Sequence, residues 1–155
     1  MTIQQYNKNL TFSNTYKHTN CQVTQGGKLV AEVANSHYCF CVCEQPIPKA
    51  GKIQFTFQIL TGSDFFVGIG FKDIMQQKNY YDCNNSGTYL IKENGPTQSH
   101  DNKDIHDKQL SLDKYIKWSK QNNPQKTFAK QWIDTSQQLY PCVGLGRKAQ
   151  IKILN

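Results

Sequence analysis

The chain has 155 residues, which suits one globular domain with a core of its own. With 37% hydrophobic and 19% charged residues, it is not expected to be disordered, and no run of about 20 apolar residues would span a membrane. The net charge is +7, but Arg147 is the only arginine. Because base readout relies on arginine, nucleic acid is a disfavoured partner, and the lysines are interpreted as a basic surface that steers an acidic partner.

The N-terminal third predicts short β-strands separated by turns. Strands are expected at residues 10–12, 28–33 and 38–43, with a Gln-Gly-Gly turn before the second. In the third strand the aromatic and valine side chains alternate with cysteines, so the two sets should lie on opposite faces. Two prolines at residues 46–48 exclude that segment from a sheet interior.

The next two predicted strands differ in how many of their faces are buried. Residues 53–59 alternate apolar and polar side chains, which predicts a half-buried strand that turns at residues 61–64. Residues 65–71 are apolar on both faces, which predicts a central strand. Gly68 and Gly70 share one face of it, which indicates that another element packs closely there.

A helical turn is expected at residues 73–78, followed by a loop over residues 80–87. Residues 88–91 predict a strand, and Asn94-Gly95 is a strong hairpin signal. The polar segment 96–108 is long for a connection, and long loops are often functional. No long helical periodicity is present.

The C-terminal part again predicts short strands. Residues 115–119 alternate as a strand, and Asn-Asn-Pro at residues 122–124 ends it. Further short strands are expected at residues 132–133, 143–145 and 151–154. Many short strands with regular turns are typical of a β-sandwich or barrel.

The six cysteines indicate free thiols, because no secretory signal follows Met1 and no Cys-x-x-Cys pair is present. Cys39, Cys41 and Cys43 have the period of a strand and should share one face. The favoured interpretation is three small side chains in a core, and the alternative is a thiolate metal site that would need a fourth ligand.

Five motifs occur in a characteristic order. They are a Gly-led amphipathic strand at residues 51–60, the Val-Gly-Ile-Gly run at 67–70, a strand ending in Asn-Gly at 87–95, Tyr-Ile-Lys-Trp at 115–118 and Leu-Tyr-Pro-Cys-Val at 139–143. In this order the chain resembles a SPRY domain, and the amino-acid sequences of the motifs are similar to those of SPRY-like domains of the ciliate type. The resemblance covers roughly residues 15–154, so residues 1–155 are expected to form a single SPRY-like domain.

The resemblance implies an all-β fold, a two-sheet antiparallel β-sandwich of the concanavalin-like kind with little helix. Residues 109–114 stand where the family has a further strand or hairpin and are too short for it. One sheet is therefore expected to be a strand short, or to have an exposed edge that a partner strand could extend.

The resemblance further implies a non-catalytic module that binds a protein or peptide through loops at one end of the sandwich. The expected binding residues are Tyr80, Tyr81, Asp82, Asn94, His100 and Asp101. Adjacent loop tyrosines suit contact anchors, and a partly buried plug is the alternative reading for the pair. A structural subunit docked through the basic surface and a sheet edge is the alternative function, and a lysine-driven nucleic-acid binder is a weaker one.

No cofactor, metal or catalytic residue is expected. Cys83 with a histidine would be a conceivable nucleophilic dyad, and His100 with His106 a conceivable metal or acid/base pair, but neither fits a recognised motif. SPRY domains often serve tripartite-motif ubiquitin ligases as substrate readers, yet the RING, B-box and coiled-coil parts are absent here, so ligase activity is not carried over. With no signal peptide visible, a cytoplasmic protein is expected.

Overall fold

The computed structural model describes residues 3–4, 9–49, 52–84, 86–92, 97–98, 115–120 and 123–154. Its larger sheet has six strands in the order β10-β9-β8-β13-β5-β2, and all neighbours are antiparallel. These strands are β2 (Phe12–Lys17), β5 (Cys39–Cys43), β8 (Phe65–Gly70), β9 (Thr88–Lys92), β10 (Thr97–Gln98) and β13 (Tyr140–Leu145).

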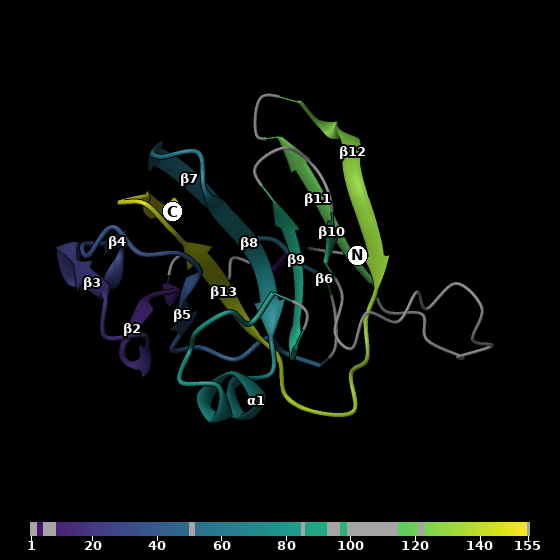
Figure 1. The fold of residues 1–155 in the computed structure, drawn as a ribbon. Coiled ribbons are helices and arrows are strands. Elements are labelled where there is room, and N and C mark those ends of the chain that lie inside the picture. The colour runs from purple at the N-terminus through teal and green to yellow at the C-terminus, as the bar shows by residue number, and fades with distance from the viewer. Residues whose placement is uncertain are drawn as a thin grey trace.

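A second antiparallel sheet has four strands in the order β3-β4-β14-β7. They are β3 (Cys21–Thr24), β4 (Leu29–Glu32), β7 (Thr56–Thr61) and β14 (Gln150–Leu154). The remaining elements are the parallel pair β1 (Ile3–Gln4) and β6 (Lys52–Ile53), the hairpin β11 (Tyr115–Lys120) and β12 (Asn123–Trp132), the short helix α1 (Lys72–Gln77) and the 3-10 turn η2 (Gln25–Gly27). The predicted all-β sandwich with little helix is confirmed (Figure 1).

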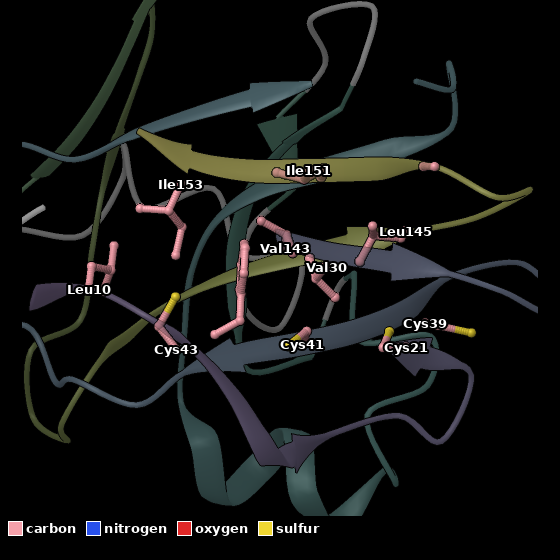
Figure 2. Close-up of a cluster of buried hydrophobic side chains, with 12 residues drawn as sticks. Leu10, Cys21, Val30, Cys39, Cys41, Cys43, Val143, Leu145, Ile151 and Ile153 are labelled. Atoms are coloured by element: carbon pink, nitrogen blue, oxygen red, sulfur yellow. The ribbon is translucent and has the colours of Figure 1, made fainter. Parts of the chain in front are cut away.

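The main core lies between the two sheets. Cys39, Cys41 and Cys43 project from β5 into this core and are fully buried, as the period-two spacing predicted. They pack with Val143 and Leu145 of β13 and with side chains of the smaller sheet, among them Val30, Ile151 and Ile153 (Figure 2). The interpretation of these cysteines as small core residues is therefore confirmed.

A second hydrophobic cluster lies on the other face of the larger sheet, where α1 packs (Figure 1). Phe40 and Val42 of β5 face this cluster, opposite to the cysteines, as predicted. Gly70 faces it as well, and a Cβ there would overlap Met75 Sδ of α1 at 2.7 Å. The glycine on this face of β8 therefore permits the close approach of α1 that the sequence indicated.

The single strand predicted at 53–59 is instead divided into β6 and β7, with residues 54–55 outside both strands. β7 then has the expected alternation, since Phe57 and Ile59 pack on the main core and Gln58 is exposed. The strand expected at 10–12 begins only at Phe12 and extends to Lys17, and β3 was not predicted, because its four residues are too few to reveal a period.

The largest error concerns β12, a ten-residue strand where only residues 132–133 were expected. β11 ends at Lys120, but Asn123 and Pro124 are already the first residues of β12, which pairs antiparallel with β11. Pro124 is tolerated because β12 has only β11 as a described neighbour, and the pairing is irregular near the turn. The strand expected to be missing near residues 109–114 lies outside the described residues.

The register of the larger sheet places several connections at one end. Leu145 of β13 pairs with Cys39 of β5 on one side and with Phe65 of β8 on the other. The segments 33–38, 62–64 and 146–149 therefore emerge together, at the end of the sheet away from α1. No helix among the described residues has the length and apolar character needed to cross a membrane.

Candidate functional site

Four loops meet at this end of the sandwich and are called here the loop end: residues 33–38, 62–64, 79–82 and 146–149. The fourth loop follows α1. It lies next to the others because the backbone of Tyr81 forms an antiparallel β-bridge with Cys39 at the start of β5. Backbone hydrogen bonds join the loops, from Gly146 N to Asp64 O, Arg147 N to Ser36 O and Asp82 N to Tyr38 O, at 2.9, 2.8 and 3.0 Å. The loops thus form one connected surface.

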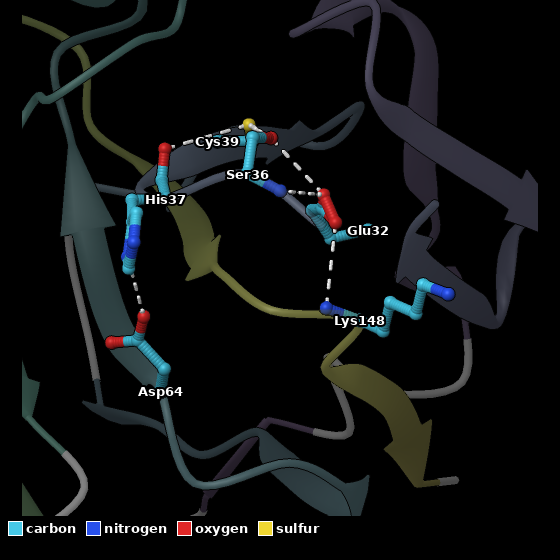
Figure 3. Close-up of polar contacts among 6 residues, drawn as sticks. All are labelled: Glu32, Ser36, His37, Cys39, Asp64 and Lys148. Carbon is cyan, nitrogen blue, oxygen red and sulfur yellow. Dashed lines mark hydrogen bonds and ion pairs between the residues drawn. The ribbon is translucent and has the colours of Figure 1, made fainter. Parts of the chain in front are cut away.

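A buried carboxylate holds two of these loops together. Glu32 ends β4 and is only 2% exposed. Its Oε2 accepts hydrogen bonds from Ser36 N at 3.0 Å and Ser36 Oγ at 3.1 Å (Figure 3). The same oxygen accepts from Ala34 N at 3.1 Å. Its Oε1 accepts from Lys148 N at 3.4 Å, across 116 positions in the chain. The carboxylate therefore fixes the course of residues 34–36 and attaches them to the β13–β14 connection.

The hydrogen bonds also determine the charge of Glu32. Burial alone would raise the pKa of this carboxyl, because the charged form loses its hydration. The donors from Ser36, Ala34 and Lys148 outweigh burial and lower the pKa below the ordinary value of a glutamate. Glu32 is therefore an ionised group at neutral pH whose charge is balanced by backbone N–H groups.

A hydrogen-bonded histidine and aspartate lie beside this buried group. His37 Nδ1 is 3.3 Å from Asp64 Oδ2, with the histidine side chain 47% exposed and the aspartate 16% (Figure 3). Gly146 allows the aspartate to lie there, because a Cβ on residue 146 would collide with Asp64 Oδ2. The pair links the β4–β5 loop to the β7–β8 loop.

The loop end concentrates unusual backbone conformations. Eight non-glycine residues of the described chain have positive φ, and all except Gln25 lie in these loops. They are Asn35, Tyr38, Asn79, Tyr80, Asp82, Arg147 and Lys148, with φ between 49° and 63°. Such conformations persist only where the surroundings enforce them, and they are frequent at functional sites.

The two adjacent tyrosines predicted as anchors have different environments. Tyr80 is 8% exposed and packs in the cluster under α1, and burial raises the pKa of its hydroxyl. Tyr81 is 47% exposed, and its ring centroid is 5.7 Å from that of His18. Tyr80 is therefore a plug beneath the loop, and of the two tyrosines Tyr81 is the one whose side chain is exposed.

Asp82, the third predicted residue of this loop, is exposed, and its carbonyl accepts a hydrogen bond from Lys78 Nζ at 2.8 Å. Asn94, His100 and Asp101 lie outside the described residues, as does the His100–His106 pair. The prediction that these residues bind a partner stays a prediction.

Sequence reasoning missed the residues that build the loop end, namely Glu32, Ser36, His37, Asp64 and Arg147. The sequence contained a signal for one of them, Arg147. Arg147 is the only arginine and lies in a Gly-Arg-Lys turn between the two last strands, where a charged residue is exposed. Nothing in the local sequence indicated that Glu32 would be buried.

The cysteines offer no chemistry to the surface. All six are buried and free, and burial raises the pKa of Cys21, Cys39, Cys41, Cys43 and Cys142. Burial raises the pKa of Cys83 to about 12, and its Sγ donates to Tyr81 O at 3.7 Å. Thiols in this state are poor nucleophiles. Among the residues described, no group of histidine, cysteine, aspartate or glutamate side chains is placed to hold a metal ion.

The sheet order, the two cores and the loop end together define a SPRY-like β-sandwich. The structure of the SPRY domain of human HERC1 matches with a TM-score of 0.67 at 18% identity, covering 93% of this chain and 97% of that domain. The stonustoxin structure matches with a TM-score of 0.61 at 14% identity, covering 94% of this chain and 27% of that one. At such identities the likeness establishes the fold. No protein-family model and no curated protein sequence matches the chain.

Proposed function

We propose that residues 1–155 form a single SPRY-like domain that binds a protein or peptide through the loop end and carries out no catalysis. The observation that carries this proposal is the Glu32 carboxylate, which holds two loops of one exposed surface in a fixed geometry. A surface whose loops are already ordered loses less conformational entropy on binding, so more of the contact energy remains as affinity.

The chemistry of the loop end suits a polypeptide ligand. Tyr81 offers a half-exposed ring, His37 and Asp64 offer polar groups, and Arg147 extends an exposed guanidinium. Tyrosine and arginine are enriched among the residues that dominate protein interfaces, and the mixture of apolar and polar groups matches such a site.

The thiols support a non-catalytic role inside the cell. A nucleophilic cysteine needs a lowered pKa and access to substrate, whereas the thiols here are buried with raised pKa values. Six unpaired cysteines in one small domain also suit a reducing compartment better than a secreted environment.

The test is an affinity pull-down from the source cell, washed at low and then at moderate salt, with mass spectrometry of the retained proteins. The wild type is compared with Tyr81→Ala combined with Arg147→Ala, and with Gln58→Ala, an exposed position on β7, as the control. We expect a small set of proteins that survives the moderate wash with the wild type and the control and is lost from the double variant.

Three outcomes would contradict the proposal. If only nucleic acid or bulk acidic proteins are retained, and all are released by moderate salt, the domain has no specific protein ligand. If the same proteins remain with the double variant, they bind elsewhere. A protein that precipitates unless one partner is co-purified in equal amount would indicate a fixed structural subunit instead.

A further inference from the structure

The β11–β12 hairpin forms a two-stranded sheet of its own beside the sandwich (Figure 1). Its inner face is attached by side chains. Ile116 packs against the cluster of Ile69 and Tyr89, and Trp118 Nε1 donates a hydrogen bond to Val67 O of β8 at 3.2 Å. Because the hairpin is anchored on this side, its other face is held outward in a defined position.

The outer face of the hairpin is basic and aromatic. Tyr115 is 43% exposed, and Lys117 and Lys130 are exposed as well. Lys130 Nζ lies 4.0 Å from the centroid of the Tyr115 ring. Between residues 115 and 132 the sequence has four lysines and no aspartate or glutamate. This short segment therefore carries more than half of the net charge of +7.

The register places two of these lysines directly opposite each other. Lys117 pairs with Lys130 across the two strands, so their side chains lie on the same face. Like charges in this position destabilise a β-sheet, whereas a single glutamate at either position would stabilise it. The pair places two ammonium groups next to each other on one exposed face, which favours a ligand that bears negative charge.

The contacts favour an acidic polypeptide over a nucleic acid. Single-stranded nucleic acid binds by stacking its bases on open aromatic faces, but Lys130 Nζ already lies over the ring of Tyr115. The segment has no arginine to grip phosphates in a fork. An extended peptide places every second side chain on one side, roughly 7 Å apart, which suits two ammonium groups held on a β-ribbon.

We propose that the outer face of β11–β12, formed by Tyr115, Lys117 and Lys130, is a docking surface for an acidic polypeptide segment, separate from the loop end. It supplies long-range attraction and register, and the loop end supplies the specific contacts of the proposed function. The two proposals fail independently, because they rest on different residues.

The first experiment measures binding of a fluorescent glutamate-rich peptide by anisotropy at low and moderate salt. The double variant Lys117→Gln/Lys130→Gln is compared with Lys49→Gln/Lys152→Gln, which removes the same charge from positions outside the hairpin. We expect the hairpin variant to bind roughly threefold to tenfold more weakly and the control to stay within about twofold of the wild type. Equal losses in the two variants would show a response to net charge alone and overturn the proposal.

The substitution Lys117→Glu gives a sharper test, because it should move stability and binding in opposite directions. It converts a like-charge pair into an opposite-charge pair, so the midpoint of thermal unfolding should rise. The same change should reduce peptide binding at least as much as the double glutamine variant. A less stable variant would contradict the premise that Lys117 and Lys130 repel each other, and one that binds as well as the wild type would contradict the proposal.

Tyr115→Ala tests whether the contact between the Tyr115 ring and the Lys130 ammonium contributes to binding in addition to the charge. The ring holds the Lys130 ammonium, so its loss should weaken peptide binding roughly twofold to fivefold without any change in net charge. An unchanged affinity would overturn the role of the ring. Tighter binding of a single-stranded oligonucleotide of equal charge would favour nucleic acid, and loss of peptide binding in Arg147→Gln/Lys148→Gln alone would move the acidic site to the loop end.

Discussion

The loop end and the β11–β12 hairpin are two exposed regions of one sandwich that are fixed by different forces. The loop end is tied from below by a buried charge, with Glu32 accepting from three loop N–H groups, and its backbone is held in left-handed conformations. The hairpin has described contacts to the sandwich through Ile116 and Trp118 of β11, and its outer face places Lys117 opposite Lys130. The geometry of the loops therefore depends on the buried Glu32 carboxylate. The position of the hairpin depends on the packing of Ile116 and the hydrogen bond of Trp118 on its inner face.

Replacement of Glu32 should have the largest effect on this contrast. Glu32→Ala removes the acceptor of three part-buried hydrogen bonds, from Ala34 N, Ser36 N and Lys148 N, and we expect a loss of about 3 kcal/mol in the free energy of unfolding. Urea denaturation measures it, with Glu44→Ala, an exposed glutamate next to β5, as the control. A loss equal to that of the control would mean that the carboxylate does not organise the loop end.

Trp118→Ala should act on the hairpin alone. The change removes packing and the hydrogen bond to Val67 O, and we expect the hairpin to be destabilised by about 2 kcal/mol. Backbone amide hydrogen exchange should accelerate in β11 and β12. It should stay unchanged at residues 33–38, since no described hydrogen bond joins these residues to the hairpin. Ser119→Ala, at an exposed neighbouring position, is the control. Faster exchange throughout the sandwich would show that the hairpin is part of the global folding unit.

Acid should weaken the loop end through Glu32. Because the folded state lowers the pKa of this carboxyl, its ionised form stabilises the fold above the ordinary glutamate value of 4.5, and that contribution is lost as the pH falls through the folded pKa. Wild-type stability should therefore decline more steeply below pH 4.5 than that of Glu32→Gln, in urea titrations at matched salt. Parallel pH profiles of the two proteins would rule out this linkage.

Tyr81→Ala should have the smallest effect on stability, within about 0.5 kcal/mol, because its ring is largely outside the core. The neighbouring Tyr80→Ala should instead cost about 3 kcal/mol, since that side chain fills the cluster under α1. Thermal unfolding of the two variants separates the anchor from the plug. Similar losses for both would place Tyr81 in the core as well.

The alternation of side chains along the strands predicted much of the fold but little of the loop end. The alternation in residues 38–43 predicted which face each side chain of β5 occupies. The glycines of β8 indicated a closely packed neighbour, which is α1 at Gly70 and the backbone of β9 at Gly68. The burial of Glu32 was not predictable, because one of its donors, Lys148 N, comes from the far end of the chain. Nor could the sequence predict that Tyr80 is buried and Tyr81 exposed, since the course of the loop decides which of two adjacent tyrosines points inward.

The six buried thiols also make this protein a reporter of its own opening. A reagent that modifies cysteine reaches Cys41 or Cys142 only when the strands around them separate, so the rate of modification measures how often the sandwich opens. For the same reason a cysteine introduced at position 81 or 117 reacts in a background of silent native thiols. Dyes can therefore be attached to the loop end or the hairpin without removal of any native cysteine.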